Sequence, residues 1–469
     1  MKHFISCWRI KVLVVWGAIL FSGVFLQAQD VTGQWNGVLS IQGMNLRLVF
    51  HINTGDGYTS TMDSPDQGAL GIPVASTAFD GSKLSLAVPT IGLSYEGEFK
   101  TDSIVGTFKQ GTLTVPMSLI RTLEEVKPVI RPQEPKPPYP YRSEEVSFEN
   151  KTAGIRLAGT LTLPSAGDNF PAVILITGSG PQDRNEEIMG HKPFLVIADY
   201  LTRHGIAVLR YDDRGFAQST GNFSTATTAD FADDAESAIA YLKTRKEINS
   251  HKTGLMGHSE GGVIAPMVAA RSKDVAFIVM LAGTGIRGDV LLLLQQELVY
   301  RVSGMPEDKR TETIQINAKI FDWMVNTKEL VSQQQIIDFM TSMKTDIETL
   351  VPEGISADNY IQQFASSLSS VWMQYFLRYD PAPALEKVQC PVLAVNGSKD
   401  LQVPPKENLT AISEALKRGG NQKVTLKEYP GLNHLFQECT TGSPAEYAAI
   451  EQTFSQEVLG DLVGWILEN

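Results

Sequence analysis

Apolar and polar residues alternate with a period of two between residues 30 and 122, and helical periodicity is absent there. Such alternation is typical of strands that bury one face. Glycine, aspartate and asparagine separate the short runs, as in turns between antiparallel strands. We therefore expect a small antiparallel barrel or sandwich over 30–122, with strands at 35–41, 46–52, 83–88, 95–99, 104–108 and 112–119. This region either has a structural role or binds a ligand, as small barrels can.

The pattern changes after residue 144, where apolar runs of strand length alternate with helical segments. This alternation predicts an α/β fold, a mostly parallel sheet flanked by helices, over 144–469. The expected strands are 171–177, 206–210, 252–256, 275–281 and 391–395, with helices near 230–245 and 263–271.

Residues 286–380 interrupt the alternation with amphipathic helical segments at 291–294, 314–324, 333–343 and 360–375. We interpret them as a helical cap inserted before the next strand of the sheet. Caps cover a site and exclude water from it. Trp372, Tyr375 and Phe376 either line a substrate pocket beneath the cap or only pack the cap onto the core.

Two segments mark the boundaries of these regions. Residues 127–141 contain six prolines, so 123–143 is predicted to be a stiff, extended linker. Residues 1–28 have the pattern of a signal peptide, with basic residues, an apolar run over 12–26 and a cleavage position after Ala28. The run is short for a bilayer span, although an uncleaved anchor is the alternative. We expect an exported bacterial protein, periplasmic or extracellular, with no stable membrane span after cleavage.

Composition narrows the classes of partner. The net charge is −12 and becomes −15 when 1–28, with three basic residues and no acidic ones, is removed. There is no basic block, so nucleic acid is not an expected partner.

Cys390 and Cys439 either form a disulfide or stay free, and free thiols are the expectation. No cluster has metal-ligand spacing, so neither a metal nor another cofactor is predicted, and the oligomeric state is left open.

The sequence Gly-His-Ser-Glu-Gly at 257–261 fits the G-x-S-x-G nucleophile elbow. Its context also fits, because an apolar strand at 252–256 precedes it and an alanine-rich helix at 263–271 follows. Such an elbow presents a serine above the edge of the sheet. Ser259 is therefore the candidate nucleophile.

A serine hydroxyl needs a histidine to take its proton and an acid to orient that histidine. Of the seven histidines only His434 follows Ser259. It lies in a turn-rich segment just after the strand pattern at 424–428. Asp400 leaves the strand at 391–395 in a turn and is the candidate acid, with Asp380 as the alternative.

The glycine-rich turn after the strand at 171–177 is the candidate oxyanion hole. We assign one donor to the backbone N–H of Ser179 and the other to that of Glu260. Four nearby side chains or backbone positions are candidate pocket residues: Gly180, Gln182, Arg184 and His258. Gln182 and Arg184 either line the site or belong to a local ion-pair network.

From about residue 148 to 469 the chain resembles the alpha/beta-hydrolases, and within them bacterial esterases with a Gly-His-Ser-Glu-Gly-Gly elbow, often grouped with prolyl-oligopeptidase-like hydrolases. Three stretches carry this resemblance: 177–184, the Tyr-Asp-Asp-Arg-Gly at 211–215 and the elbow. Ala217 departs mildly from the usual glycine. The resemblance implies a triad of Ser259, Asp400 and His434 that hydrolyses a small-molecule carboxylic ester. The leading hypothesis is a secreted carboxylesterase for small to medium acyl esters. The alternatives are a serine peptidase or aminopeptidase, and a non-catalytic ligand-binding protein on a hydrolase scaffold.

Overall fold

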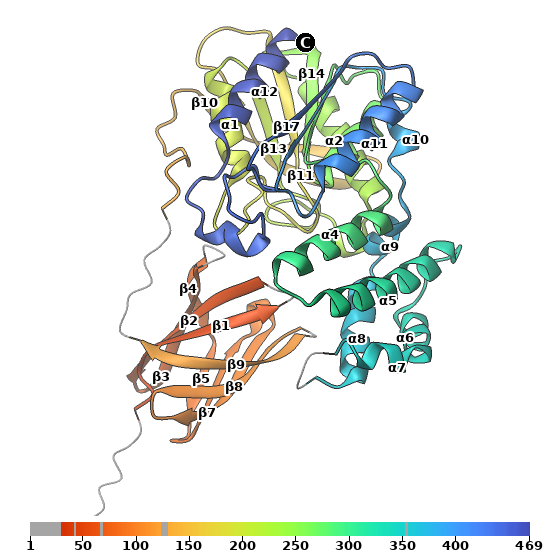
Figure 1. The fold of residues 1–469 in the computed structure, drawn as a ribbon. Coiled ribbons are helices and arrows are strands. Elements are labelled where there is room, and N and C mark those ends of the chain that lie inside the picture. Colours follow the sequence, from red (N-terminus) through yellow and green to blue (C-terminus); the bar gives the residue numbers. More distant parts are fainter. Residues whose placement is uncertain (1–29, 42–43, 66–68, 112, 123–129, 352–354) are drawn as a thin grey trace, which may run out of the picture.

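The computed structural model describes residues 30–41, 44–65, 69–111, 113–122, 130–351 and 355–469. They form an all-β region and a larger α/β region with a helical insertion (Figure 1). The predicted signal segment 1–28 lies outside the described residues. Within them, no helix has the length and apolar character that a bilayer crossing needs.

The all-β region is a nine-stranded antiparallel sheet in the order β4-β3-β2-β1-β9-β8-β7-β6-β5. The sheet curls so that β3 and β5 approach each other, and the Thr77 hydroxyl donates to Ser60 Oγ at 2.8 Å. Its strands are β1 (Gly33–Ile41), β2 (Met44–Gly55), β3 (Gly57–Ser64), β4 (Ala69–Val74), β5 (Ser76–Phe79), β6 (Lys83–Val88), β7 (Leu93–Lys100), β8 (Ser103–Gln110) and β9 (Leu113–Thr122).

Large side chains fill the interior of this curled sheet. Trp35 and Tyr95 are fully buried. Trp35 Nε1 donates to the carbonyl of Val31 at 2.8 Å, and the Tyr95 hydroxyl donates to that of Ile104 at 2.8 Å. Their polar atoms are thus satisfied inside a packed core, as buried polar groups require.

The α/β region contains an eight-stranded sheet in the order β10-β11-β13-β12-β14-β15-β16-β17. β10 and β11 are antiparallel to their neighbours, and the pairs from β13 onward are parallel. The bounds are β10 (Arg142–Asn150), β11 (Ile155–Leu163), β12 (Phe170–Ile176), β13 (Ala207–Tyr211), β14 (Ile248–His258), β15 (Ile278–Leu281), β16 (Val392–Gly397) and β17 (Val424–Tyr429). The predicted mostly parallel sheet is confirmed.

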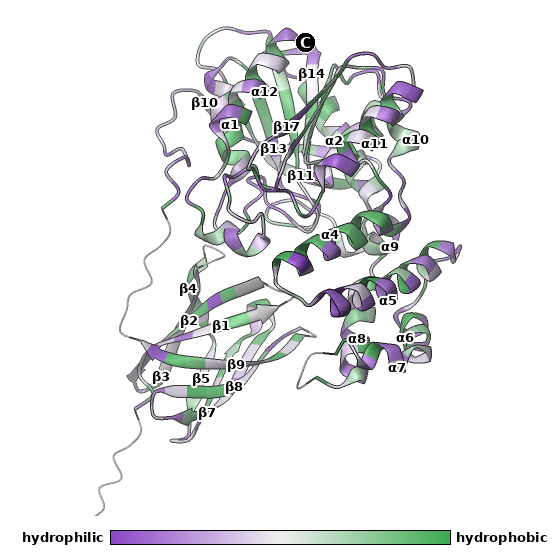
Figure 2. Ribbon diagram, in the orientation of Figure 1, coloured by the Kyte–Doolittle hydropathy of each residue, from purple (hydrophilic) through white to green (hydrophobic). Residues whose placement is uncertain are grey.

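Helices cover both faces of this sheet. α1 (Pro193–Arg203) and α12 (Gln456–Glu468) share one apolar cluster with the strands. On the other face lie α2 (Thr228–Leu242), α3 (Gly261–Ala269), α10 (Ala382–Leu385) and α11 (Pro405–Arg418). Figure 2 shows the central strands as hydrophobic, as expected for strands buried on both faces.

The insertion has a core of its own, built from the apolar faces of its helices. It consists of α4 (Gly288–Val302), α5 (Glu307–Asn326), α6 (Gln333–Ser342), α7 (Lys344–Glu348), α8 (Ala357–Leu368) and α9 (Val371–Arg378). The single helix expected over 360–375 is therefore wrong. It is broken between α8 and α9 because Ser370 caps a new helix, its Oγ accepting from the Met373 N–H.

The second half of the proline-rich segment is fastened to the α/β region. The Arg131 guanidinium donates to the carbonyls of Met189, Ala448 and Ile450, and Gln133 exchanges hydrogen bonds with Thr453 and Phe454. Residues 123–129 lie outside the described residues. From Arg131 onward this segment is held against the α/β region rather than spanning open space.

Candidate active site

A strained turn presents Ser259 between β14 and α3. Ser259 has φ +54°, in the left-handed region that non-glycine residues rarely adopt. The turn is so tight that a Cβ on Gly257 would lie 1.8 Å from the Gly261 carbonyl oxygen, and one on Gly261 would lie 2.2 Å from that of Ile176. The glycines are therefore required by space, and the strain is of the kind stored at functional sites.

His434 and Asp400 meet at the carboxyl edge of the sheet, after β17 and β16. His434 Nδ1 lies 2.8 Å from Asp400 Oδ2. The other oxygen, Oδ1, accepts from the backbone N–H groups of Gln402 and Val403, both at 2.8 Å. This carboxylate is thereby fixed, and it holds the Nδ1–H tautomer, which leaves His434 Nε2 as the basic nitrogen.

Ser259 and His434 line the same cavity. In the described part of the chain the Ser259 hydroxyl has no hydrogen-bond partner, and such contacts often tighten only when substrate binds. Asp380, the alternative acid, is exposed and accepts from the Ala382 N–H at 3.0 Å instead. The structure thus brings Asp400, and not Asp380, to the histidine.

Two backbone N–H groups stand beside Ser259 without a partner among the described residues, those of Ser179 and Glu260. The neighbouring Gly178 N–H is already used, because it donates to Glu186 Oε1 at 2.7 Å. Ser179 lines the cavity, and Glu260 directly follows the serine. These are the two donors that the sequence suggested for an oxyanion.

Glu186 is a buried residue of the site that the sequence analysis missed. Its Oε1 also lies 3.0 Å from His258 Nδ1, and His258 Nε2 lies 3.0 Å from the His434 carbonyl oxygen. Both ring nitrogens of His258 thus face acceptors, which favours the doubly protonated ring. Burial alone would lower the pKa of His258, but the Glu186 carboxylate and the His434 carbonyl raise it above its usual value.

The Glu260 side chain joins the elbow to the cap. Its Oε1 accepts from the Thr228 hydroxyl at 2.7 Å and from Trp372 Nε1, on α9, at 2.8 Å. Burial raises the pKa of Glu260, against the opposing effect of hydrogen bonds from Thr228, Trp372 and Ser179. A residue next to the nucleophile is therefore held from both the core and the cap.

The cavity around Ser259 has a volume of about 240 Å³. Five residues expected in the pocket or the oxyanion hole line it: Ser179, Gln182, His258, Trp372 and Phe376. Residues of its wall that the sequence analysis did not single out include Leu291, Leu292, Gln295 and Gln402. Gln402 lies two residues after Asp400 and could have been found from that position.

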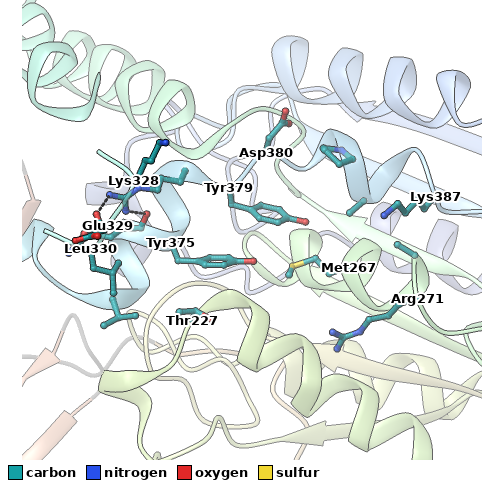
Figure 3. Close-up of a pocket in the computed structure, with 16 residues that line it drawn as sticks. Thr227, Met267, Arg271, Lys328, Glu329, Leu330, Tyr375, Tyr379, Asp380 and Lys387 are labelled. Carbon is teal, nitrogen blue, oxygen red and sulfur yellow. Dashed lines mark hydrogen bonds between the residues drawn. The ribbon is translucent and has the colours of Figure 1, made fainter. Parts of the chain in front are cut away.

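Three expected pocket residues lie elsewhere. Arg184 is turned away into ion pairs with Asp212 and Glu145, so the local-network alternative is the right one. Gly180 borders a separate small cavity next to Asp213. Tyr375 points into a larger cavity of about 880 Å³, on another face of α9 and distinct from the catalytic cavity (Figure 3).

Cys390 and Cys439 are free thiols. Within the described residues, no group of three or more histidine, cysteine or acidic side chains is arranged to hold a metal ion. What the site offers chemically is a partly exposed nucleophile in a cavity, an oriented base and two free N–H groups. These are the parts needed for acyl transfer.

The chain is similar to several known proteins. The family described as serine aminopeptidase, S33, matches residues 192–438, more than half of the chain. Esterase EstD of Thermotoga maritima is 27% identical over 325 residues, which cover 69% of this chain and 68% of that protein. An uncharacterized 31.7 kDa protein of Escherichia coli, from the traX-finO intergenic region, is 26% identical over 265 residues. These cover 56% of this chain and 84% of that protein.

Among solved structures, DcsB in complex with its substrate analogue is 18% identical, with a TM-score of 0.42, covering 70% of this chain and 100% of that one. Est1E from Butyrivibrio proteoclasticus with bound ferulic acid is 18% identical, with a TM-score of 0.40. The match covers 69% of this chain and 98% of that one.

Proposed function

The chain belongs to the serine aminopeptidase S33 family of hydrolases, and on that basis we propose that it is an exported carboxylesterase acting on small acyl esters. The predicted alpha/beta-hydrolase fold and the predicted class, serine hydrolase, are confirmed. The observation that carries the proposal is the His434–Asp400 pair beside a serine held at positive φ in one cavity.

In the proposed reaction the Ser259 hydroxyl attacks the ester carbonyl carbon while His434 Nε2 takes its proton. The negative charge that develops on the carbonyl oxygen is bound by the N–H groups of Ser179 and Glu260. The C–O bond to the alcohol then breaks, and the alcohol leaves with the proton from His434. Water repeats the sequence on the acyl-serine and releases the acid.

The size of the cavity favours small substrates. Its volume of about 240 Å³ lies below the roughly 300–1,000 Å³ that is common for drug-sized ligands. Apolar side chains from the cap, among them Leu292, Trp372 and Phe376, form part of its wall. Short acyl groups fit such a space, so we place the preferred substrates at the small end of the small-to-medium range.

The wall of the cavity also favours esters over peptides with a free amino terminus. An aminopeptidase needs an anionic group for the substrate's ammonium. Among the residues that line the cavity, Glu186 carries the one carboxylate side chain. The charge of that carboxylate is already paired with His258, and its Oε1 also accepts from the Gly178 N–H. EstD, the relative compared above, carries the name esterase.

The alternative of a non-catalytic protein, with a ligand in the barrel, has less support. Trp35, Phe50 and Tyr95 are fully buried inside the β region, so its interior is filled by its own side chains. We retain a structural role for this region.

The substitution Ser259→Ala tests the proposal. p-Nitrophenyl acetate, butyrate and octanoate are compared with p-nitroanilides on the full chain. We expect turnover of acetate and butyrate by the wild type, and a loss of about a thousand-fold or more in kcat for Ser259→Ala. Ser303→Ala, an exposed serine on the cap, is the matched control and should keep full activity. Retention of more than about a tenth of the activity by Ser259→Ala would remove the proposed nucleophile.

Two further results bear on the finer parts of the proposal. Faster turnover of anilides than of esters would favour the peptidase alternative. Recovery of a chain that starts at Gln29 in an exported fraction would support the location, whereas an intact amino terminus in the cytoplasm would contradict it.

A further inference from the structure

Helix α9 separates the catalytic cavity from a second, larger one. Trp372 and Phe376 face the catalytic cavity, whereas Val371, Tyr375 and Arg378 lie on another face of the helix and line a space of about 880 Å³. This second cavity is bounded by α9, by the segment after α5, and by α3 and α10 of the hydrolase core (Figure 3). Its volume is in the upper part of the range for small-molecule sites, about 300–1,000 Å³.

The body of the second cavity is apolar and aromatic. The rings of Tyr375 and Tyr379 stack with centroids 5.7 Å apart. In Figure 3 both rings extend across the cavity toward Met267 and Arg271. Leu330, at the edge, is 57% exposed and adds apolar surface to the rim. These walls can accept a flexible hydrocarbon chain.

Positive charge exceeds negative charge around this apolar body. Its wall includes four basic residues, Arg271, Lys328, Arg378 and Lys387, and two acidic ones, Glu329 and Asp380. Arg271 is partly neutralised by Asp233 and Glu236. Even so, the excess of basic residues stands out in a chain whose net charge is −12.

Arg378 is a basic residue of this wall whose charge is not balanced by a carboxylate among the described residues. Its guanidinium donates to the carbonyls of Gln374, Met324, Thr327 and Glu329, and among the described residues no carboxylate pairs with it. Its buried Nε has no hydrogen-bond partner. A cation that is partly removed from water and lacks a counter-ion favours the approach of an anion.

We propose that this cavity is a second binding site, for an amphipathic carboxylate with a flexible hydrocarbon tail. The tail lies against Tyr375, Tyr379 and Met267. The carboxylate faces the basic residues at the rim and near Arg378. Binding here requires no chemistry at Ser259, so the proposal stands or falls independently of the proposed esterase activity.

Calorimetric titration of sodium decanoate into the full chain, below its micelle concentration, tests the site. We expect one molecule to bind, about ten-fold or more tightly than decanol or decyltrimethylammonium, because only the carboxylate complements the basic wall. Ala384→Phe places a ring in this cavity and should weaken binding by at least about ten-fold. The pair Arg271→Gln and Lys387→Gln should weaken it by about three- to ten-fold, since both charges are exposed.

Gln295→Phe fills the catalytic cavity instead and is the matched control, which should bind decanoate as the wild type does. If Ala384→Phe does not fold, Met267→Phe takes its place. Absence of binding, unchanged binding by the filled variant, loss of binding in Gln295→Phe, or equal affinity for the cationic amphiphile would each overturn the proposal.

Discussion

Replacing Glu186 by glutamine removes one negative charge from the active-site wall while keeping the shape of the side chain. In the wild type the Glu186 carboxylate accepts from Gly178 N–H and faces His258 Nδ1, and the pKa of His258 is raised. Without the carboxylate, burial would instead lower the pKa of His258. The ring would then be neutral near pH 7, and the charge-assisted contact would become an ordinary hydrogen bond.

The size of the effect follows from the kind of contact that is lost. Hydrogen bonds to charged groups contribute about 1.5–3 kcal/mol to stability, and neutral ones about 0.5–1.5 kcal/mol. The difference between the two kinds of contact is about 1 kcal/mol, so we expect Glu186→Gln to lower the free energy of unfolding by about 1 kcal/mol near pH 6.

The pH dependence of this difference is the sharper test. Because the folded-state pKa of His258 lies above its usual value of 6.5, its stabilising contribution is fully present below about pH 6.5 and is lost as the pH rises through the folded pKa. The difference between wild type and variant should thus shrink toward about pH 9.

Denaturant unfolding at about pH 6 and about pH 9 measures both values. Glu187→Gln is the matched control, since the neighbouring residue is exposed, and it should change stability by less than about 0.5 kcal/mol at either pH. An equal or larger effect of Glu186→Gln at the higher pH would refute the charged His258–Glu186 pair.

Three further predictions concern the acid, a buried histidine and the docked linker. Asp400→Asn should lower kcat by about 10⁴-fold without unfolding the protein, since the amide no longer holds the reactive tautomer; a neutral effect in an esterase assay would exclude Asp400. Burial lowers the pKa of His191 to about 4, so stability should fall by up to about 3 kcal/mol between about pH 6.5 and pH 4. His191→Gln should flatten this slope in urea titrations, and an unchanged slope would assign it to other groups. A truncated chain starting at residue 130 should fold, hydrolyse small esters and melt about 5 °C above one starting at 142, which lacks Arg131 and Gln133; equal melting would mean that these contacts contribute nothing.

The features of the site that follow apolar strands could be predicted from the sequence. Ser259, Asp400 and His434 each stand just past such a strand, and parallel strands bring their carboxyl ends to one edge of the sheet. The structure places the three residues at this edge. Their roles in catalysis remain predictions until the substitutions are measured.

Residues whose contacts depend on distant elements could not be predicted in this way. Glu186 lies in an irregular loop at φ +53°, and no periodicity marks its meeting with His258. Trp372 and Tyr375 are both aromatic residues of α9, yet only the rotation of that helix against the core decides which cavity each one enters. The apolar periodicity over 360–375 also concealed the break, which Ser370 produces by capping.

The strands β3, β4 and β5 were missed for another reason. β3 consists largely of polar and small residues, so alternation is faint, and its place is set by pairing with β2. Neighbouring strands, rather than intrinsic propensity, stabilise such a segment.

The docking of Arg131 sets the length of the tether between the two regions. β9 ends at Thr122, nine residues before Arg131. A fully extended chain spans at most about 3.6 Å per residue, so the end of β9 stays within about 32 Å of Arg131. A tether this short holds the β region at an effective concentration in the millimolar range next to the hydrolase. Even a contact too weak to form between separate molecules would therefore be populated within this chain.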